Sequence, residues 1–509
     1  MIDRGTAGRL RPRRGDVAYR GGFDVQALLA REGLLVVVWA FWVAVLLLVA
    51  PALLSPDSWL ALVAGREIAS SGLPHVNTLT AWGAGRHWID QQWGGQLLLY
   101  EATRIGGVRD LMWVSVGSVA TALALVAIAG RRLGGSTAST ALALSLPIVG
   151  APWMAQVRAQ CLALPLFVAT YWLLVSSATR RSRALWVLPL LAVWANLHGS
   201  VVMAAGLVFL TGVVCLVRDR GRDRVYAGVL ALGAPVCVLV SPYNVGLVSY
   251  YRSMLVHSPI ERFVTEWQPP TPAAMTAVFY ATAIVLAVAW GAHRRALTTF
   301  ERWALPLLLL SGLSAVRNVM WFELAAAIAA PRLIDAAWSR RSTQTDGQRR
   351  FNLLLAVVAL GAVAIVGAVA GSRSDAAYLS HWPSAADAAA VSRAAGPHGL
   401  VLPDDQTGDW LLWDEPSLAG RVAYDTRLEL FTAKELEQLQ LLHVGSHPIW
   451  RACGSKARVV TFAGPSGAVD ARRERVFARG SRTILSTPAL VAVVQPTSNT
   501  VACPLARSS

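Results

Sequence analysis

Acids, histidines and tryptophans are concentrated in residues 55–95, directly after the first long apolar run of the chain. Asp57 stands near the start of this segment, and near its end Asp90 is accompanied by Trp88, Gln92 and Trp93. A carboxylate such as Asp57 can take a proton from an attacking hydroxyl as a general base. Structural roles are also open, because Asp57 can cap the following helix and Asp90 can pair with Arg86 or a backbone group.

The chain that carries this segment has the composition of a membrane protein. Of its 509 residues, 55% are hydrophobic and 15% are charged, and the mean hydropathy is +0.47. The apolar residues gather into runs close to the roughly 20 residues with which a helix spans a bilayer. The sequence therefore predicts a polytopic α-helical membrane protein with about eleven transmembrane helices. The predicted spans are 34–54, 111–130, 137–153, 162–177, 185–197, 201–217, 225–240, 275–292, 303–316, 319–338 and 353–370.

Arginine clusters between the apolar runs determine the expected orientation. Cytoplasmic loops are enriched in Lys and Arg, and alternating the spans from a cytoplasmic N-terminal tail (residues 1–32) puts every cluster on the cytoplasmic side. The transmembrane domain then covers residues 33–371. Its large first loop, 55–110, lies outside the membrane. Topology thus accounts for the net charge of +16, and no nucleic-acid partner is expected.

From residue 372 onward, short β-branched runs alternate with polar turns. The stretches GLVLPDD, GRVAYDT, ARVVTFAG and ALVAVVQP predict strands, and residues 433–442 predict a helix. The threading makes 372–509 an extracytoplasmic α/β domain, where oxidising conditions permit a disulfide between Cys453 and Cys503. The acids of PDDQTGDW (403–410) can bind a divalent cation through oxygen, but their spacing differs from an EF-hand loop, and a solvated turn is the favoured interpretation.

The first loop has a characteristic order of residues: Asp57, Trp59, Gly65, Ile68, Gly72, Pro74, Asn77, Thr80, Trp88, Asp90, Gln92 and Trp93. With this order the loop resembles that of polytopic glycosyltransferases of the GT-C superfamily, and most closely that of bacterial relatives of the dolichyl-phosphate-mannose–protein mannosyltransferases. The resemblance implies that residues 33–371 form a GT-C-like transmembrane domain. Similar motifs follow in WANLHGS (194–200), SPYN (241–244), RNVMWF (317–322), TGDWLLW and RVAYDTRLELF. Members commonly carry a pair of acids at the first-loop motif, whereas here Asp57 is followed by Ser58.

The resemblance implies transfer of a sugar from a polyprenyl-phosphate donor to a glycan, lipid or protein acceptor of the cell envelope, at the outer face of the plasma membrane. This chemistry needs a base, groups that stabilise the departing phosphate and an apolar groove for the prenyl chain. Asp57 is the expected base, with Asp90 as an alternative base or a sugar-binding group. Trp88, Gln92 and Trp93 are the expected sugar contacts, although indoles also favour the membrane interface for structural reasons.

The phosphate of such a donor needs cations on the outer face. Arg158, His198 and Arg317 lie at outer span ends in the threading, where an ionisable residue is costly without a partner. Each also has a structural alternative. Arg317 can pair with Glu323 or another acid at the membrane edge, His198 can pack between two short spans, and Arg158 can extend its charged end to the interface.

Two other classes of function stay open from the sequence. A transporter or lipid flippase would suit a chain with this many spans, although the spans contain few of the ionisable residues that transport sites use. A catalytically inactive GT-C scaffold is the third hypothesis. No cofactor is expected with certainty, and no metal ligand is assigned, but a divalent cation is left open.

Overall fold

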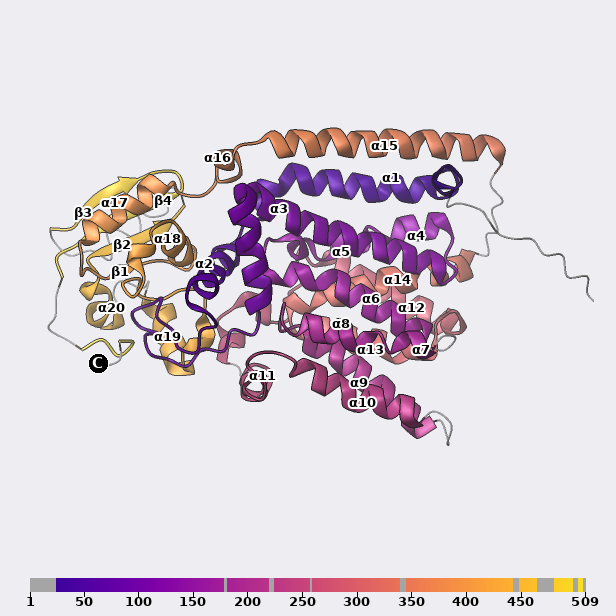
Figure 1. Ribbon diagram of the computed structural model, residues 1–509, viewed down its shortest axis with the longest axis horizontal. Coiled ribbons are helices and arrows are strands. Elements are labelled where there is room, and N and C mark those ends of the chain that lie inside the picture. Colours follow the sequence, from indigo (N-terminus) through magenta and orange to yellow (C-terminus); the bar gives the residue numbers. More distant parts are fainter. Residues whose placement is uncertain are drawn as a thin grey trace, which may run out of the picture.

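The computed structural model describes residues 24–177, 181–218, 224–256, 259–338, 345–442, 448–464, 480–497 and 502–506. Long helices form one part of the molecule, and a smaller domain with a four-stranded sheet lies at one end of them (Figure 1). Helices α1 (Val25–Val49) and α15 (Asp346–Ser372) run side by side along one edge (Figure 1). The predicted tail lies mostly in residues 1–23, outside the described residues, and α1 begins within its last part.

Every apolar run predicted to span the membrane contains helix. Besides α1 and α15, these helices are α3 (Trp93–Arg132), α4 (Thr137–Ala143), α5 (Leu146–Gly150), α6 (Ala163–Ser176), α8 (Val187–Trp194), α9 (Val201–Arg218), α10 (Arg224–Val238), α12 (Ala277–His293), α13 (Thr299–Ser314) and α14 (Val319–Trp338). Within the described ranges, five helical segments are long and apolar enough to cross a membrane: Val25–Leu53, Trp93–Arg132, Ala159–Ser176, Ala277–Ala296 and Asp346–Ser372. Shorter apolar helices accompany them at Thr137–Gly150, Val201–Val217 and Arg224–Val238. A polytopic helical membrane protein is thus confirmed, and the number of spans stays a prediction.

Contacts at the helix ends agree with the predicted alternation of spans. Near the start of α1, the buried Glu32 pairs with Arg131 at the end of α3, with a 2.7 Å separation. Asp335, near the end of α14, accepts a hydrogen bond from the Ser136 N–H directly before α4, at 2.6 Å. Both contacts join ends that the threading puts on the same, cytoplasmic side. The C-terminal domain lies at the opposite end of the helices (Figure 1).

Helix α2 (Pro56–Ser71) and the first part of α3 build the first loop. The apolar stripe of α2 predicts a helix lying on the membrane surface, but α2 instead packs between α3 and α18 (Gly408–Asp414) and is buried from Ser58 to Gly65. Ser55 and Ser58 form the capping box of α2. Asp57 lies in the first turn and is not the cap, so its carboxylate is free of that structural role.

The C-terminal domain has a sheet with the strand order β1 (Val401–Leu402), β2 (Val459–Ala463), β4 (Leu490–Val494), β3 (Arg482–Ser486). Strands β1 and β2 are parallel, and the other pairs are antiparallel. Around the sheet lie α17 (Ala385–Ala395), α18, α19 (Ala433–Leu442) and α20 (Pro448–Ala452) (Figure 1). The predicted helix is confirmed as α19, and Cys453 and Cys503 form the predicted disulfide. GRVAYDT is not a strand, because Val422 makes only isolated bridges, to Thr80 and Val401.

The C-terminal domain is attached to the first loop by backbone and side-chain contacts. The N–H groups of Ala81 and Trp82 donate to the carbonyls of Val422 and Ala423. The Arg86 guanidinium donates to both carboxylate oxygens of Glu435, at 2.8 and 2.7 Å. Asp90 therefore does not pair with Arg86, because Arg86 reaches across to the other domain. Hydrogen bonding of Asp90 to the Gln92 backbone agrees with the alternative of a backbone partner.

Candidate functional site

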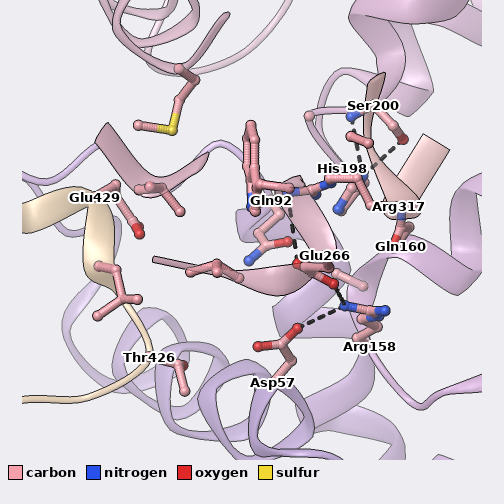
Figure 2. Close-up of a pocket in the computed structure, with 18 of the residues that line it drawn as sticks. Asp57, Gln92, Arg158, Gln160, His198, Ser200, Glu266, Arg317, Thr426 and Glu429 are labelled. Atoms are coloured by element: carbon pink, nitrogen blue, oxygen red, sulfur yellow. Dashed lines mark hydrogen bonds and ion pairs between the residues drawn. The ribbon is translucent and has the colours of Figure 1, made fainter. Parts of the chain in front are cut away.

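A cavity of about 1020 Å³ lies where the first loop, the helical part and the C-terminal domain meet. Its lining comes from the start of α2, from α11 (Gly246–Val256), from the turns before α9 and α14, and from residues 425–429 of the C-terminal domain. The cavity brings together residues that are far apart in the sequence: Asp57, Gln92, Arg158, His198 and Arg317 (Figure 2).

Four helices begin at this cavity: α2, α3, α9 and α14. Residues at or directly before their first turns line it, namely 55–57, 91–92, 199–200 and 317–318. The N-terminus of a helix has free N–H groups and a partial positive charge, which stabilise a bound anion. These helix N-termini thus add partial positive charge to the cavity, beside the charges of its side chains.

Asp57 faces a cation at the edge of the cavity. Its Oδ2 is 3.1 Å from Arg158 Nη1, and 42% of its side chain is exposed (Figure 2). The guanidinium and the N-terminus of α2 both stabilise a negative charge at this position. Asp57 is therefore a carboxylate that a molecule in the cavity can reach.

Glu266 connects the two predicted arginines. Its Oε2 is 3.0 Å from Arg158 Nη1, and its Oε1 is 3.8 Å from Arg317 Nη1. Burial disfavours the ionised form of Glu266, but the two arginines outweigh burial and lower its pKa. The Arg317 guanidinium also lies 4.2 Å from the centre of the Trp267 ring. Arg317 therefore does not pair with Glu323, but its contact with Glu266 agrees with the alternative of a structural pair with another acid at the membrane edge.

His198 is held in one orientation beside the arginines. Its Nδ1 accepts a hydrogen bond from the Ser200 N–H at 3.1 Å, and the residue is 7% exposed. Burial, together with the charges of Arg317 and Arg158, lowers the pKa of His198 well below its usual value. The ring is therefore neutral with its proton on Nε2, which leaves that N–H as a hydrogen-bond donor.

The structure places three predicted site residues outside the cavity lining. Asp90 is 2% exposed, and burial raises its pKa to about 7. Trp88 is buried with its ring 4.3 Å from the Arg427 guanidinium. Trp93 donates from Nε1 to Asn196 Oδ1 at 3.0 Å, which joins the start of α3 to the segment before α9. All three residues therefore have structural contacts outside the cavity lining.

Three cavity carboxyls were not singled out from the sequence, Glu266, Asp425 and Glu429. Glu266 comes from the Pro-rich loop after α11, whose composition indicates structure but no chemistry. Glu429 lies in RVAYDTRLELF, which the resemblance includes without assigning a role to its acids. Only the packing of the C-terminal domain against the first loop brings Glu429 to the cavity.

The acids of the turn at 403–410 are used within the domain. Asp404 Oδ1 accepts from the Thr407 N–H at 3.0 Å, and Asp409 Oδ2 accepts from the Thr426 N–H at 3.1 Å. Asp405 accepts from the Tyr424 hydroxyl at 3.0 Å. Across the described part of the chain, no group of three or more His, Cys, Asp or Glu side chains is arranged to hold a metal ion.

No protein-family model matches the chain, and no curated protein does. Among solved structures, the chain is similar to ArnT from Cupriavidus metallidurans bound to undecaprenyl phosphate, with a TM-score of 0.50 and 13% identity over 92% of this chain and 99% of that chain. It is also similar to the apo oligosaccharyltransferase of Archaeoglobus fulgidus, with a TM-score of 0.48 and 12% identity over 86% of this chain and 71% of that chain.

At this level of identity, the likeness to ArnT establishes a shared fold. The chain is a polytopic helical membrane protein with the GT-C fold and a C-terminal domain that contains a small sheet. The fold predicted from the sequence is thus confirmed. The roles of the cavity residues are a separate question, which their own geometry has to answer.

Proposed function

We propose that the protein is an integral-membrane glycosyltransferase that transfers a sugar from a polyprenyl-phosphate donor, with Asp57 as the general base. The observation that carries this proposal is the convergence of Asp57, Arg158, Arg317 and four helix N-termini on one cavity. A carboxylate beside fixed cations and helix N-termini suits the displacement of a phosphate by a hydroxyl. ArnT, whose fold the chain shares, binds undecaprenyl phosphate in its structure.

In the proposed reaction, Asp57 receives a proton while negative charge develops on the donor phosphate. The acceptor hydroxyl attacks the anomeric carbon and transfers its proton to Asp57, a new carbon–oxygen bond forms, and the bond to the phosphate oxygen breaks with its electron pair on the phosphate. Once Asp57 is neutral, Arg158 loses that ionic partner and can stabilise the departing polyprenyl phosphate. Arg317 and the Nε2–H of His198 lie on the same wall for this purpose (Figure 2).

Helix α11 supplies an apolar border for the prenyl chain. Tyr250, Tyr251, Met254 and Leu255 of this helix line the cavity. Leu255 is also 62% exposed, and Val256 beside it is 64% exposed, so α11 joins the cavity to an outward apolar surface. A lipid chain can lie along such a surface while its phosphate remains at the arginines. We place this arrangement on the outer face of the plasma membrane, with a cell-envelope glycan, lipid or protein as the acceptor.

The direct test is sugar transfer by the purified protein from a panel of labelled polyprenyl-phosphate sugars to cell-envelope fractions. Asp57→Asn is expected to lower the rate of transfer by about 100- to 10,000-fold, the usual contribution of general acid–base catalysis. Glu101→Gln, which changes an exposed acid of α3, is the matched control and should keep wild-type activity. Full activity of Asp57→Asn would remove Asp57 from its role. Vesicle uptake of a lipid-linked sugar without transfer would favour the transporter.

A further inference from the structure

Glu429 is a cavity carboxyl that the proposed reaction does not use. It comes from the C-terminal domain and lies opposite the wall of Arg158, Arg317 and His198 (Figure 2). Its carboxyl group is hydrogen-bonded by its own backbone N–H. No side chain of another described residue forms an ion pair or hydrogen bond with it, in contrast to Asp57 and Glu266. A partly buried carboxyl is costly unless its remaining hydrogen-bonding capacity is satisfied, here by a ligand.

The backbone around Glu429 is fixed by contacts on both sides. The carbonyl of Leu430 accepts a hydrogen bond from Arg86 at 2.7 Å. Arg427 donates to Asn77 Oδ1 at 2.7 Å and stacks on Trp88. Each of these contacts ties the segment to the first loop, which also carries Asp57. The position of Glu429 relative to Asp57 is therefore set by the fold.

The acids near Glu429 disfavour an anionic group on its side of the cavity. Burial is the largest cause that raises the pKa of Glu429 to about 7, and Asp425 and Asp57 act in the same direction. The cation Arg427 lowers this pKa, but its charge is balanced by its ion pair with Asp425. A phosphate would be repelled here and attracted to the arginines on the other wall. A carboxyl that is partly protonated near neutral pH can both donate and accept hydrogen bonds, which is what a hydroxyl group needs.

We propose that Glu429 binds the acceptor, and that the C-terminal domain thereby selects an uncharged, hydroxyl-bearing acceptor. The inference rests on the proposed glycosyl transfer, because only a group-transfer site has a separate acceptor. Glu429 orients the acceptor hydroxyl toward Asp57, while the donor phosphate occupies the arginine wall. The second carboxyl that is missing next to Asp57 in the first loop is in this way supplied by a different domain.

The test is site-specific carboxyl labelling of the full chain with a water-soluble carbodiimide and glycine ethyl ester, read by mass spectrometry. The probes are methyl mannoside, methyl glucoside and methyl arabinoside as uncharged glycosides, glucosamine as an amine, and inorganic phosphate and undecaprenyl phosphate as anions. With a bound glycoside at about ten times its dissociation constant, labelling of Glu429 should slow about tenfold, because only the free fraction reacts. Labelling of Glu437, an exposed acid of α19, should stay constant as the internal control.

Protection of Glu429 by at least one glycoside, without protection by either anion, supports the inference. Protection by undecaprenyl phosphate or inorganic phosphate but by no glycoside would overturn it, because Glu429 would then face the donor. Protection by glucosamine alone, protection by none of the probes, or a Glu429 that does not react would overturn it as well. A chain that is protected in this way but transfers no sugar would contradict the proposed function and not the acceptor site.

Transfer kinetics give a second readout. Glu429→Ala should raise KM for the acceptor about tenfold, because it removes both the donor and the acceptor that hold the hydroxyl, with kcat close to wild type. Glu437→Ala is the matched control in the same domain. An equal fall of kcat and kcat/KM in Glu429→Ala would overturn the acceptor-binding role, since it would place Glu429 in the chemical step.

Discussion

Asp57 and Glu429 carry the same functional group in one cavity, and their neighbours give them different properties. Arg158 balances the charge of Asp57 at 3.1 Å, whereas burial and nearby acids raise the pKa of Glu429 to about 7. Asp57 is thus suited to accept a proton, and its protonation leaves Arg158 available to the phosphate. Glu429 is suited to exchange hydrogen bonds with a neutral ligand. Residue type alone would not have separated these two roles.

Asp90 is a predicted site residue that the structure buries outside the cavity lining. Its pKa is raised from 3.8 to about 7. At a pH between these two values, Asp90 is protonated in the folded chain and ionised in the unfolded chain. Asp90 therefore contributes stability that is present at low pH and is lost as the pH rises through about 7. As the pH rises from about 5 to about 8, the unfolding temperature of Asp90→Asn should therefore fall less than that of wild type.

The measurement is the unfolding temperature in detergent at both pH values, with Glu437→Gln as the control for an exposed acid. An Asp90→Asn variant whose stability falls with pH as steeply as wild type would show that Asp90 ionises normally. Hydrogen bonds from Gln92 and Gln96 and the charge of Arg427 would then outweigh its burial.

At the scale of elements, α3 changes direction where the first loop meets the membrane helices. Gly107 has a φ of 74°, and Asp375 of the segment after α15 approaches it and accepts a hydrogen bond from the Val108 N–H at 3.3 Å. Gly107→Ala should destabilise the fold by about 1–3 kcal/mol, because a side chain at this backbone conformation is strained and its Cβ would collide with Asp375.

The matched control is Gly117→Ala in the same helix, where a Cβ meets open space. This variant should keep or raise the unfolding temperature, since alanine favours helix more than glycine does. Equal unfolding temperatures for Gly107→Ala and Gly117→Ala would show that the bend in α3 does not depend on Gly107.

The elements were largely predictable because membrane helices can be recognised in a sequence by their length and apolar composition. All predicted runs contain helix, and residues 433–442 form the predicted α19. The surface position expected for α2 was wrong, because its burial depends on α18, which is more than 300 residues away in the sequence. The site was predictable only in part: Asp57, Arg158 and Arg317 stand out as charges at span ends, whereas Glu266 and Glu429 reach the cavity through loop paths that no local pattern specifies.

At the scale of the whole molecule, the account requires the cavity and the C-terminal domain to lie on the same outer side of the membrane. The disulfide between Cys453 and Cys503 agrees with an oxidising compartment. Alkaline phosphatase fused after residue 506 should therefore be active in cells, because it folds only outside the cytoplasm, and green fluorescent protein fused there should be dark. Alkaline phosphatase fused after Gly134, beyond the end of α3, is the matched control and should be inactive. The reverse pattern would mean that the chain is inserted the other way up.

The most direct measurement of the central claim is an experimental structure of the full chain with undecaprenyl phosphate. The account predicts the phosphate in contact with Arg158 or Arg317, beside Asp57, with the prenyl chain leaving along α11. A phosphate bound elsewhere on the chain, or Asp57 and the two arginines facing separate closed environments in that structure, would contradict the account.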